Sequence, residues 1–200
     1  MSQNATCTRP DDVDARIVEA AFNGDNRAFE QIVVRYEQPI YHLCVRYVGE
    51  GADAEDAAQD AFVKAFMHRE KFDVNRPLLP WLMTIARRLC IDRLRRQKRA
   101  NIVPAVDTDT MQSDERDADE RIHEKKMLEI LASSLEALPE GQRETVVLYH
   151  VDGLAYKEIA GVLDVPVGTV MTWLHRGRAK LQKWYYERTA TGLRAATQGE

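Results

Sequence analysis

The chain has 200 residues, of which 44% are hydrophobic and 30% charged, and its formal net charge is −4. This composition is typical of a globular protein with room for one medium domain or two small ones. No stretch approaches the roughly 18 to 20 apolar residues of a membrane span, and the start MSQNATCTRPDD lacks the basic and apolar segments of a secretory signal. We therefore expect no membrane insertion and a cytoplasmic location.

Cysteine usage gives no sign of cross-linking or metal binding. The three cysteines, Cys7, Cys44 and Cys90, are odd in number and far apart along the chain, whereas a disulfide framework or a zinc site needs paired spacing. We interpret Cys44 and Cys90 as small core residues and Cys7 as a thiol in the tail that is free to react. We expect no metal and no cofactor.

Four helices are predicted in the first half of the chain, where apolar residues recur every three or four positions. A short helix lies around 17–22, and a long one covers 25–48, capped by Asp25 or Asn26 and ended by Gly49. A third helix, over 51–66, has a narrow alanine-rich stripe opposite an acidic face. After a polar turn, the run PWLMTIARRLCIDRLRRQKR predicts a fourth helix that is apolar on one side and basic on the other.

The helical pattern lapses between Ala100 and Glu120. From Asp107 to Glu120 there are seven acidic residues and a single basic one, Arg116, a composition that favours a solvated, flexible linker. We expect the parts on either side of it to adopt many relative orientations when no partner is bound.

The second half of the chain is also predicted to be helical. The pattern resumes over 122–138, stops at Pro139-Glu140-Gly141, resumes through Val146 and Tyr149, and continues to about Tyr186. The predicted fold class is all-α, with two small helical domains joined by a flexible acidic linker. We expect a disordered tail at 1–11, a first domain at 12–100, the linker at 101–121, a second domain at 122–186 and a frayed tail at 187–200.

The most informative segment is LAYKEIAGVLDVPVGTVMTWLHRGRAKLQKW. It predicts a helix-turn-helix: a helix from Tyr156 to Leu163, a turn at Asp164-Val165 and a second helix that begins at Pro166. The second helix buries Val170, Leu174 and Leu181. Its other side suits the major groove of DNA and carries Thr169, Thr172, Arg176, Arg178, Lys180 and Lys183. An ordinary antiparallel helix pair with a solvated basic face is the alternative.

A second basic element runs from Arg87 to Arg99, with seven Arg or Lys side chains against one acidic residue, Asp92. Such a charge suits a phosphate backbone. The residues just before it could together hold an unstacked base of a single strand: Phe72, Asp73, Asn75, Arg76 and Trp81. A solvated helix face is the alternative, and for Trp81 itself we favour a place in the core.

The acidic face of the third helix carries Asp53, Glu55, Asp56 and Asp60. Carboxylates near a helix N-terminus interact favourably with the helix dipole, which explains Asp53 and Asp56 without any partner. Asp60 lies further along the helix, where the dipole does not explain it. We therefore infer a basic protein partner for this face.

Four segments match, in order, a pattern known from one protein family. AFEQIVVRYEQPIYHLC is similar to its opening helix, DAEDAAQDAFVKAF to its polymerase-binding helix, PWLMTIARRLCIDRLRRQKR to its segment that reads the −10 promoter element, and LEALPEGQRETVVLYHVDGLAYKEIAGVLDVPVGTV to its fourth region. The chain thus resembles the extracytoplasmic-function group of the sigma-70 family, over about residues 26–99 and 125–184. One such match is weak evidence, whereas the ordered series is highly specific.

The resemblance implies a sigma factor that directs RNA polymerase to promoters and opens the DNA strands. Its implied partners are core RNA polymerase, promoter DNA and an anti-sigma factor. The implied polymerase-binding residues are Asp53, Glu55, Asp56 and Asp60. The implied residues at the −10 element are Asp73, Asn75, Arg76, Arg87, Arg88, Arg95 and Arg96. Those at the −35 element are Thr169, Met171, Thr172, Trp173, Arg176, Arg178 and Lys180.

The resemblance also implies that the acidic linker threads toward the active-site cleft or the RNA exit path of the polymerase. We hypothesise that its negative charge occupies the space of nucleic acid until the transcript displaces it. Neutralising Asp114, Glu115, Asp117 and Asp119 is then expected to change abortive initiation and promoter escape.

Two positions depart from the pattern of the family. Members often carry Arg-Ser-Arg after the Gly-Thr-Val, whereas this chain has Met171-Thr172-Trp173 and so lacks two cationic side chains where −35 contacts are expected. We expect it to read an unusual DNA sequence. Ala155 stands in place of the Ser of a Ser-x-x-Glu capping box that includes Glu158, a loss of about 1 kcal/mol that leaves the fold intact.

Other functions fit the sequence less well. The five histidines are dispersed, and HEKKM at His123 lacks the second histidine of the zinc-protease pattern HExxH because Met127 stands there, so we expect no enzyme. A stand-alone helix-turn-helix regulator is the main alternative, but it requires neither the second basic element nor the acidic face. A scaffold of helical repeats is disfavoured because no period of roughly 20 to 50 residues is visible.

Overall fold

The structure is a computed structural model, and it describes residues 15–99, 130 and 132–196, the last of these without the side chains of 188–196. The chain divides into two compact units, the first formed by the described helices before residue 110 and the second mainly by those after it. All regular structure within the described residues is helical, which confirms the all-α prediction. None of the described helices is long and apolar enough to cross a membrane.

Several predictions concern residues outside this range. They are the tail with Cys7, the predicted domain limits between 100 and 122, and the acidic linker with Asp114, Glu115, Asp117 and Asp119. Most of the helix predicted over 122–138 also lies outside the described residues, although 132–136 are helical.

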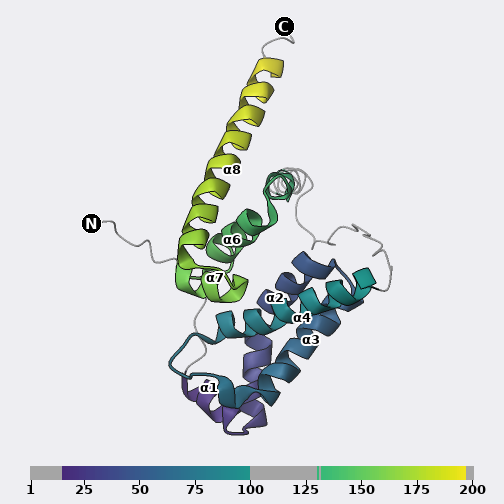
Figure 1. Cartoon of the computed structure of the whole chain (residues 1–200), viewed down its shortest axis with the longest axis vertical. Coiled ribbons are helices and arrows are strands. Elements are labelled where there is room, and N and C mark those ends of the chain that lie inside the picture. Colours follow the sequence, from purple (N-terminus) through teal and green to yellow (C-terminus); the bar gives the residue numbers. More distant parts are fainter. Residues whose placement is uncertain (1–14, 100–129, 131, 197–200) are drawn as a thin grey trace, which may run out of the picture. The chain divides into compact units, whose positions relative to one another are not determined.

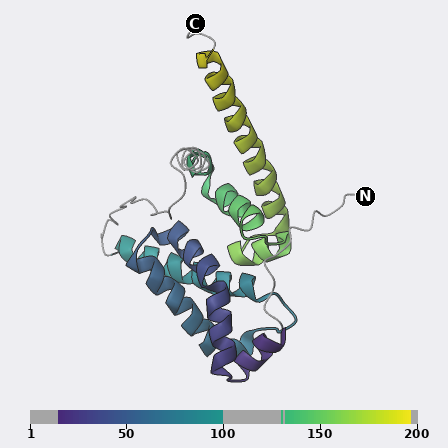
Figure 2. The same ribbon diagram turned by 180° about the vertical axis from the view of Figure 1, so that it is seen from behind.

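Within residues 15–99, the first unit has four helices and one 3₁₀ turn: α1 Ala15–Phe22, α2 Asn26–Val48, α3 Ala52–Met67, η1 Arg69–Lys71 and α4 Leu78–Arg99. Helices α2, α3 and α4 lie side by side, each packed against the other two, and α1 packs against α2 (Figure 1). The same bundle is seen from behind in Figure 2. The four helices predicted from the sequence are therefore confirmed, with α4 beginning two residues earlier than Pro80.

The caps of α2 agree with the sequence. The Asp25 carboxylate accepts hydrogen bonds from the backbone N–H groups of Arg27 (2.9 Å) and Ala28 (3.2 Å), which satisfies two of the donors that a helix start leaves unpaired. Gly49 ends the helix with a φ of 84°, in the left-handed region that favours glycine. Local sequence thus fixes both ends of this helix.

The core of the first unit lies between α2, α3 and α4. Its fully buried members include Ile32, Ile40, Leu43, Ala57, Ala61, Leu82 and Met83. The small alanines of α3 permit close helix packing. Cys44 and Cys90 are buried as well, as predicted. A hydrogen bond that the Cys44 thiol donates to the Cys90 sulfur, together with burial, raises the pKa of Cys44, which therefore stays a protonated, inert thiol.

The second unit contains α6 Glu140–His150, α7 Tyr156–Leu163 and the long α8 Val167–Ala196. A cluster of Leu138, Val146 and Leu174 joins α6 to α8, with Leu135, Tyr149, Tyr156 and Leu181 packed around it. The far half of α8 extends beyond α6 and α7 (Figure 1). The break predicted at Pro139-Glu140-Gly141 is shorter than expected, because Glu140 and Gly141 already belong to α6. The carbonyl of Pro139 accepts from the N–H groups of Gln142 and Arg143 and so starts the helix there.

Candidate nucleic-acid interface

The acidic residues of α3 all lie on its exposed side. Asp53, Glu55, Asp56 and Asp60 are exposed, while the alanines between them are buried against α2 and α4. The helix has this two-sided character because its alanines and acidic residues alternate at helical spacing. The predicted acidic face is therefore present on the surface of the first unit.

One arginine of α4 gathers three of these carboxylates. The Arg93 guanidinium lies 3.6 Å from a carboxylate oxygen of Asp53, 3.7 Å from one of Asp56 and 3.4 Å from one of Asp60. It also donates to the backbone carbonyl of Asp53 at 2.5 Å, and the Gln97 amide donates to the Asp53 carboxylate at 3.1 Å. Only 21% of the Arg93 side chain is exposed, against 55–65% of its three partners.

Sequence reasoning missed this role of Arg93. It counted Arg93 among the basic residues of the fourth helix, because spacing along one helix does not reveal which neighbouring helix a side chain meets. We refer below to Asp53, Glu55, Asp56, Asp60 and Arg93 as the acidic face, since four carboxylates against one guanidinium leave a formal charge of −3.

The basic residues of α4 do not all point to solvent. Arg88, Arg95 and Arg96 are exposed, and Arg95 forms an ion pair with Asp92 at 3.7 Å. Arg87 is half-buried instead: its Nε donates to the Tyr47 hydroxyl at 2.7 Å, and its guanidinium carbon lies 5.7 Å from the centre of the Tyr47 ring. Arg87, predicted to meet DNA, is thus placed in a contact between α2 and α4.

The loop before α4 is held by its own hydrogen bonds. Asp73 Oδ1 accepts from the backbone N–H and the side-chain amide of Asn75, both at 3.1 Å, and its Oδ2 lies 3.3 Å from Arg76 Nε. The hydrogen bonds from Asn75 and the charge of Arg76 lower the pKa of Asp73. The three predicted residues are therefore brought together in one exposed, pre-shaped turn.

Trp81 belongs to an aromatic cluster beside this loop. Its ring lies 5.9 Å from that of Phe22 and 5.0 Å from that of Phe72, and the Phe22 and Phe72 rings are 5.3 Å apart. All three side chains are half-buried. This arrangement supports the packing interpretation of Trp81, and it anchors the loop to α1 and α4.

The helix-turn-helix is present where the sequence predicts it. Asp164 takes a φ of 58°, and the N–H of Val165 donates to the Ala160 carbonyl at 3.1 Å, which closes α7. Helix α8 begins at Val167, one residue later than predicted, and the carbonyl of Pro166 accepts from Thr169 and Val170. Glu158 still makes half of the capping box, because its carboxylate accepts from the Ala155 N–H at 2.7 Å.

The first half of α8 turns a mixed surface outward. Met171, Thr172, His175, Arg176 and Lys180 are exposed. Val170 and Leu174 are buried as predicted, while Leu181 is half-buried. Thr169, predicted on the exposed side, is also half-buried.

Two residues predicted to meet DNA also contact α6, and of these Arg178 remains exposed. Trp173 is half-buried, and its ring is so close to Gly141 that a methyl group on that glycine would lie 2.8 Å away. The guanidinium of Arg178 lies 4.8 Å from the centre of the Tyr149 ring, and its Nε donates to His150 Nε2 at 3.0 Å. Partial desolvation and the charge of Arg178 lower the pKa of His150, although this residue is exposed.

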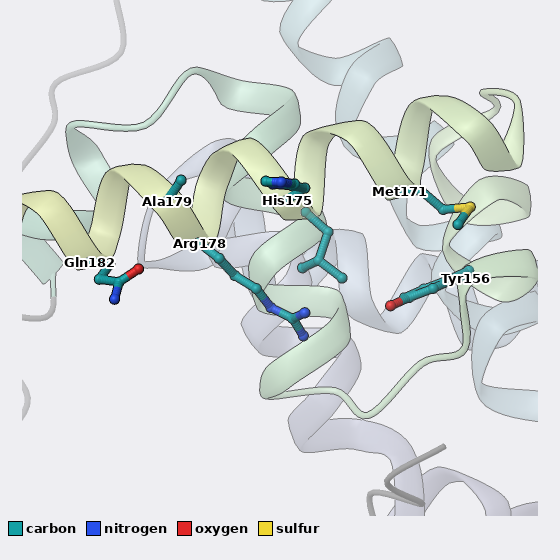
Figure 3. Close-up of a pocket in the computed structure, with 7 residues that line it drawn as sticks. Tyr156, Met171, His175, Arg178, Ala179 and Gln182 are labelled. Carbon is teal, nitrogen blue, oxygen red and sulfur yellow. The ribbon is translucent and has the colours of Figure 1, made fainter. Parts of the chain in front are cut away.

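An open groove of about 440 Å³ runs along α8 beside the start of α7. Figure 3 shows Met171, His175, Arg178, Ala179 and Gln182 along α8, with Tyr156 opposite. No acid–base pair converges there. Among the described residues, no group of three His, Cys, Asp or Glu side chains could hold a metal ion.

Comparison with known proteins agrees with this geometry. The sigma-70 region 2 family model matches residues 32–100, and the sigma-70 region 4 model matches residues 128–181. The ECF RNA polymerase sigma factor SigW of Bacillus subtilis is 36% identical over 168 residues, which cover 80% of this chain and 90% of that protein. The chain belongs to the extracytoplasmic-function sigma factors.

Further relatives of this sigma factor are similar along most of their length. The ECF RNA polymerase sigma-E factor of Escherichia coli is 33% identical over 175 residues, which cover 82% of this chain and 90% of that protein. CnrH, solved in complex with the cytosolic domain of CnrY, matches with a TM-score of 0.61 and 28% identity, over 87% of this chain and 97% of CnrH. The sigma factor RpoE of Bartonella quintana shares the fold, with a TM-score of 0.64 and 22% identity over 79% of this chain and 96% of its own.

The two matched regions of the sigma factor contain the surfaces described above. Region 2 includes the acidic face, the Asp73 loop and the basic residues of α4, and region 4 includes α6, α7 and the first half of α8. Family membership confirms the resemblance found in the sequence. It also excludes the alternative of a stand-alone helix-turn-helix regulator.

Proposed function

We propose that this sigma factor binds core RNA polymerase through the acidic face of α3. Its four carboxylates, Asp53, Glu55, Asp56 and Asp60, are exposed and carry a formal charge of −3 together with Arg93. A positively charged partner surface is attracted to such a face and oriented by it. Arg93 restrains three of the carboxylates, so the partner meets a surface that is already ordered.

The −10 element is the proposed ligand of the Asp73 loop and the basic side of α4. Arg88, Arg95 and Arg96 supply positive charge for phosphates. Asn75 and Arg76 lie in a turn that Asp73 shapes before any DNA arrives, which lowers the entropic cost of holding an unpaired base. Arg87 supports this helix through Tyr47.

The −35 element is the proposed ligand of the first half of α8. The second helix of a helix-turn-helix enters the major groove with the side chains near its N-terminus. The exposed residues there include Met171, Thr172 and Arg176, with Arg178 and Lys180 further along and the half-buried Thr169 at the edge. Trp173 and Arg178 hold α8 on α6 and so position this surface.

Regulation by an anti-sigma factor follows from the relatives. CnrH was solved in complex with the cytosolic domain of CnrY, and RpoE in complex with the anti-sigma factor NepR. A protein that covers the acidic face or the DNA-contacting surfaces prevents both partners from binding. In this account the chain works in the cytoplasm, carries no cofactor and catalyses nothing, since the polymerase performs nucleotidyl transfer.

One observation carries the proposal: a single domain exposes an acidic face on α3 and a basic face on α4, while the other domain exposes a helix-turn-helix. The test is the affinity of core polymerase for the chain with Asp56→Arg plus Asp60→Arg. We expect a loss of roughly tenfold or more, because attraction becomes repulsion. The matched control is Glu30→Arg plus Glu37→Arg, an equal charge change on the exposed side of α2. Equal affinities for both variants would refute the proposal.

A further inference from the structure

The exposed strip at the start of α8 contains two apolar groups where a recognition helix usually carries charge. Met171 is 53% exposed, and Thr172 beside it is exposed as well. His175 and Arg176 continue the same strip one turn later, because residues three and four apart share a face. Trp173, which interrupts this run in the sequence, packs against Gly141 and leaves the strip.

The hydroxyl group of Thr172 is already engaged inside the helix. Its Oγ1 donates to the Gly168 carbonyl at 2.9 Å, as threonine often does four residues along a helix. A threonine hydroxyl has a single donor, so the side chain offers its methyl group and an acceptor to the outside. A β-branched side chain has little freedom to rotate away from this arrangement.

The base that matches such a surface is thymine. In the major groove each base pair shows a distinct edge, and thymine alone presents a methyl group, at C5, that apolar side chains contact. Guanine, by contrast, is read by a cationic side chain at O6 and N7. Met171 and Thr172 offer no cation, and the nearest one on the strip is Arg176.

We propose that Met171 and Thr172 make this sigma factor specific for thymine methyl groups in its −35 element. The thioether chain of Met171 and the methyl group of Thr172 contact the C5-methyl groups of adjacent thymines. Arg176 binds a guanine or a phosphate at the next base pair. This inference rests on the proposed role of α8.

Uracil substitution tests the inference, because uracil differs from thymine only by the missing C5-methyl. Holoenzyme is bound to duplexes of its own promoter in which each thymine of the −35 element is replaced singly. Removing one buried methyl group should weaken binding about fourfold at one or two positions. Uracil in the spacer between the two promoter elements is the control and should leave the affinity of the holoenzyme unchanged.

Two variants assign each methyl contact to its side chain. Thr172→Ser keeps the hydrogen bond to Gly168 but loses the methyl, so the uracil penalty at its own thymine should vanish; Met171→Ala should do the same at the neighbouring thymine. The inference is wrong if the −35 element contains no thymine, or if no single uracil substitution in it weakens binding. It is also wrong if the loss of affinity caused by uracil is the same in both variants as in the wild type. Absence of any promoter complex would instead refute the proposed function.

Discussion

Two glycines set how closely α8 approaches α6 in the second unit. A methyl group on Gly177 would lie 2.8 Å from Cγ2 of Val146, and one on Gly141 would lie 2.8 Å from the Trp173 ring. Such distances force a neighbour to move, and a branched valine inside a packed core cannot move cheaply. These two glycines therefore matter for the packing of the helix-turn-helix on its support.

Replacing Gly177 by alanine should destabilise the second unit. Overpacking costs about 1–3 kcal/mol, which exceeds the gain of about 1 kcal/mol that alanine brings to a helix. Hydrogen exchange of the α6 amides measures the change, and Val146→Ala in the same chain should restore protection. Gly161→Ala is the matched control: no atom lies within 4 Å of the added methyl group, so protection should stay equal or rise.

His150 should make the second unit sensitive to acid. Its pKa is lowered from the ordinary value of 6.5, first by partial desolvation and then by Arg178. The unfolded chain therefore binds the proton more readily, and the stabilising contribution of neutral His150 is complete above about pH 6.5. It decreases as the pH falls from there through the lowered pKa.

Unfolding measured between pH 7.5 and 5.5 should show this loss in the wild type. His150→Gln keeps an acceptor for Arg178 without a titrating ring, so it should show a smaller loss over that range. His175→Gln, on the exposed side of α8, is the control and should behave as the wild type. Identical profiles for wild type and His150→Gln would contradict the account.

At the scale of elements, Arg93 connects α4 to α3. Arg93→Ala leaves Asp53, Asp56 and Asp60 without their shared cation and should cost about 1 kcal/mol, a value already reduced for the exposure of the carboxylates. Hydrogen exchange of the α3 amides measures this loss of stability, which should be smaller in high salt because salt screens the ion pairs. Arg95→Ala, whose partner Asp92 lies on the same helix, should stay within about 0.5 kcal/mol. Equal costs for both would refute the proposed role of Arg93.

Local sequence predicted most elements because their ends depend on adjacent residues. The Asp25 cap, Gly49 at the end of α2 and the Asp164 turn are set by side chains and dihedrals within a few positions. The acidic and basic faces were predictable in the same way, from spacing along one helix.

Contacts between helices were not predictable from spacing. Arg87 meets Tyr47 forty residues away, and Arg93 meets Asp53 at the same separation. Arg178 and Trp173 are residue types that often contact DNA from a recognition helix. In this structure Arg178 contacts the Tyr149 ring of α6, and Trp173 packs against Gly141 of α6. Which helix a side chain meets depends on packing that a single sequence does not state.

For the whole molecule, the net charge of −4 conceals surfaces of opposite sign. Affinity for promoter DNA should depend on salt through the exposed basic side chains. Replacing Arg88, Arg95 and Arg96 by Gln should lower the slope of log affinity against log salt by about 0.7–0.9 for each phosphate that is no longer neutralised. Arg87→Gln should leave the slope unchanged and instead destabilise α4, since its partner is Tyr47.

Run-off transcription tests the central claim most directly. Purified core polymerase transcribes a genomic promoter library in four reactions: with the wild-type chain, with Asp56→Arg plus Asp60→Arg, with the control Glu30→Arg plus Glu37→Arg, and with no sigma factor. The account predicts discrete start sites that require the wild-type chain and vanish with the charge reversal, while Glu30→Arg plus Glu37→Arg retains them. Start sites unaffected by the reversal, or no transcription together with sequence-specific duplex binding by the free chain, would contradict it.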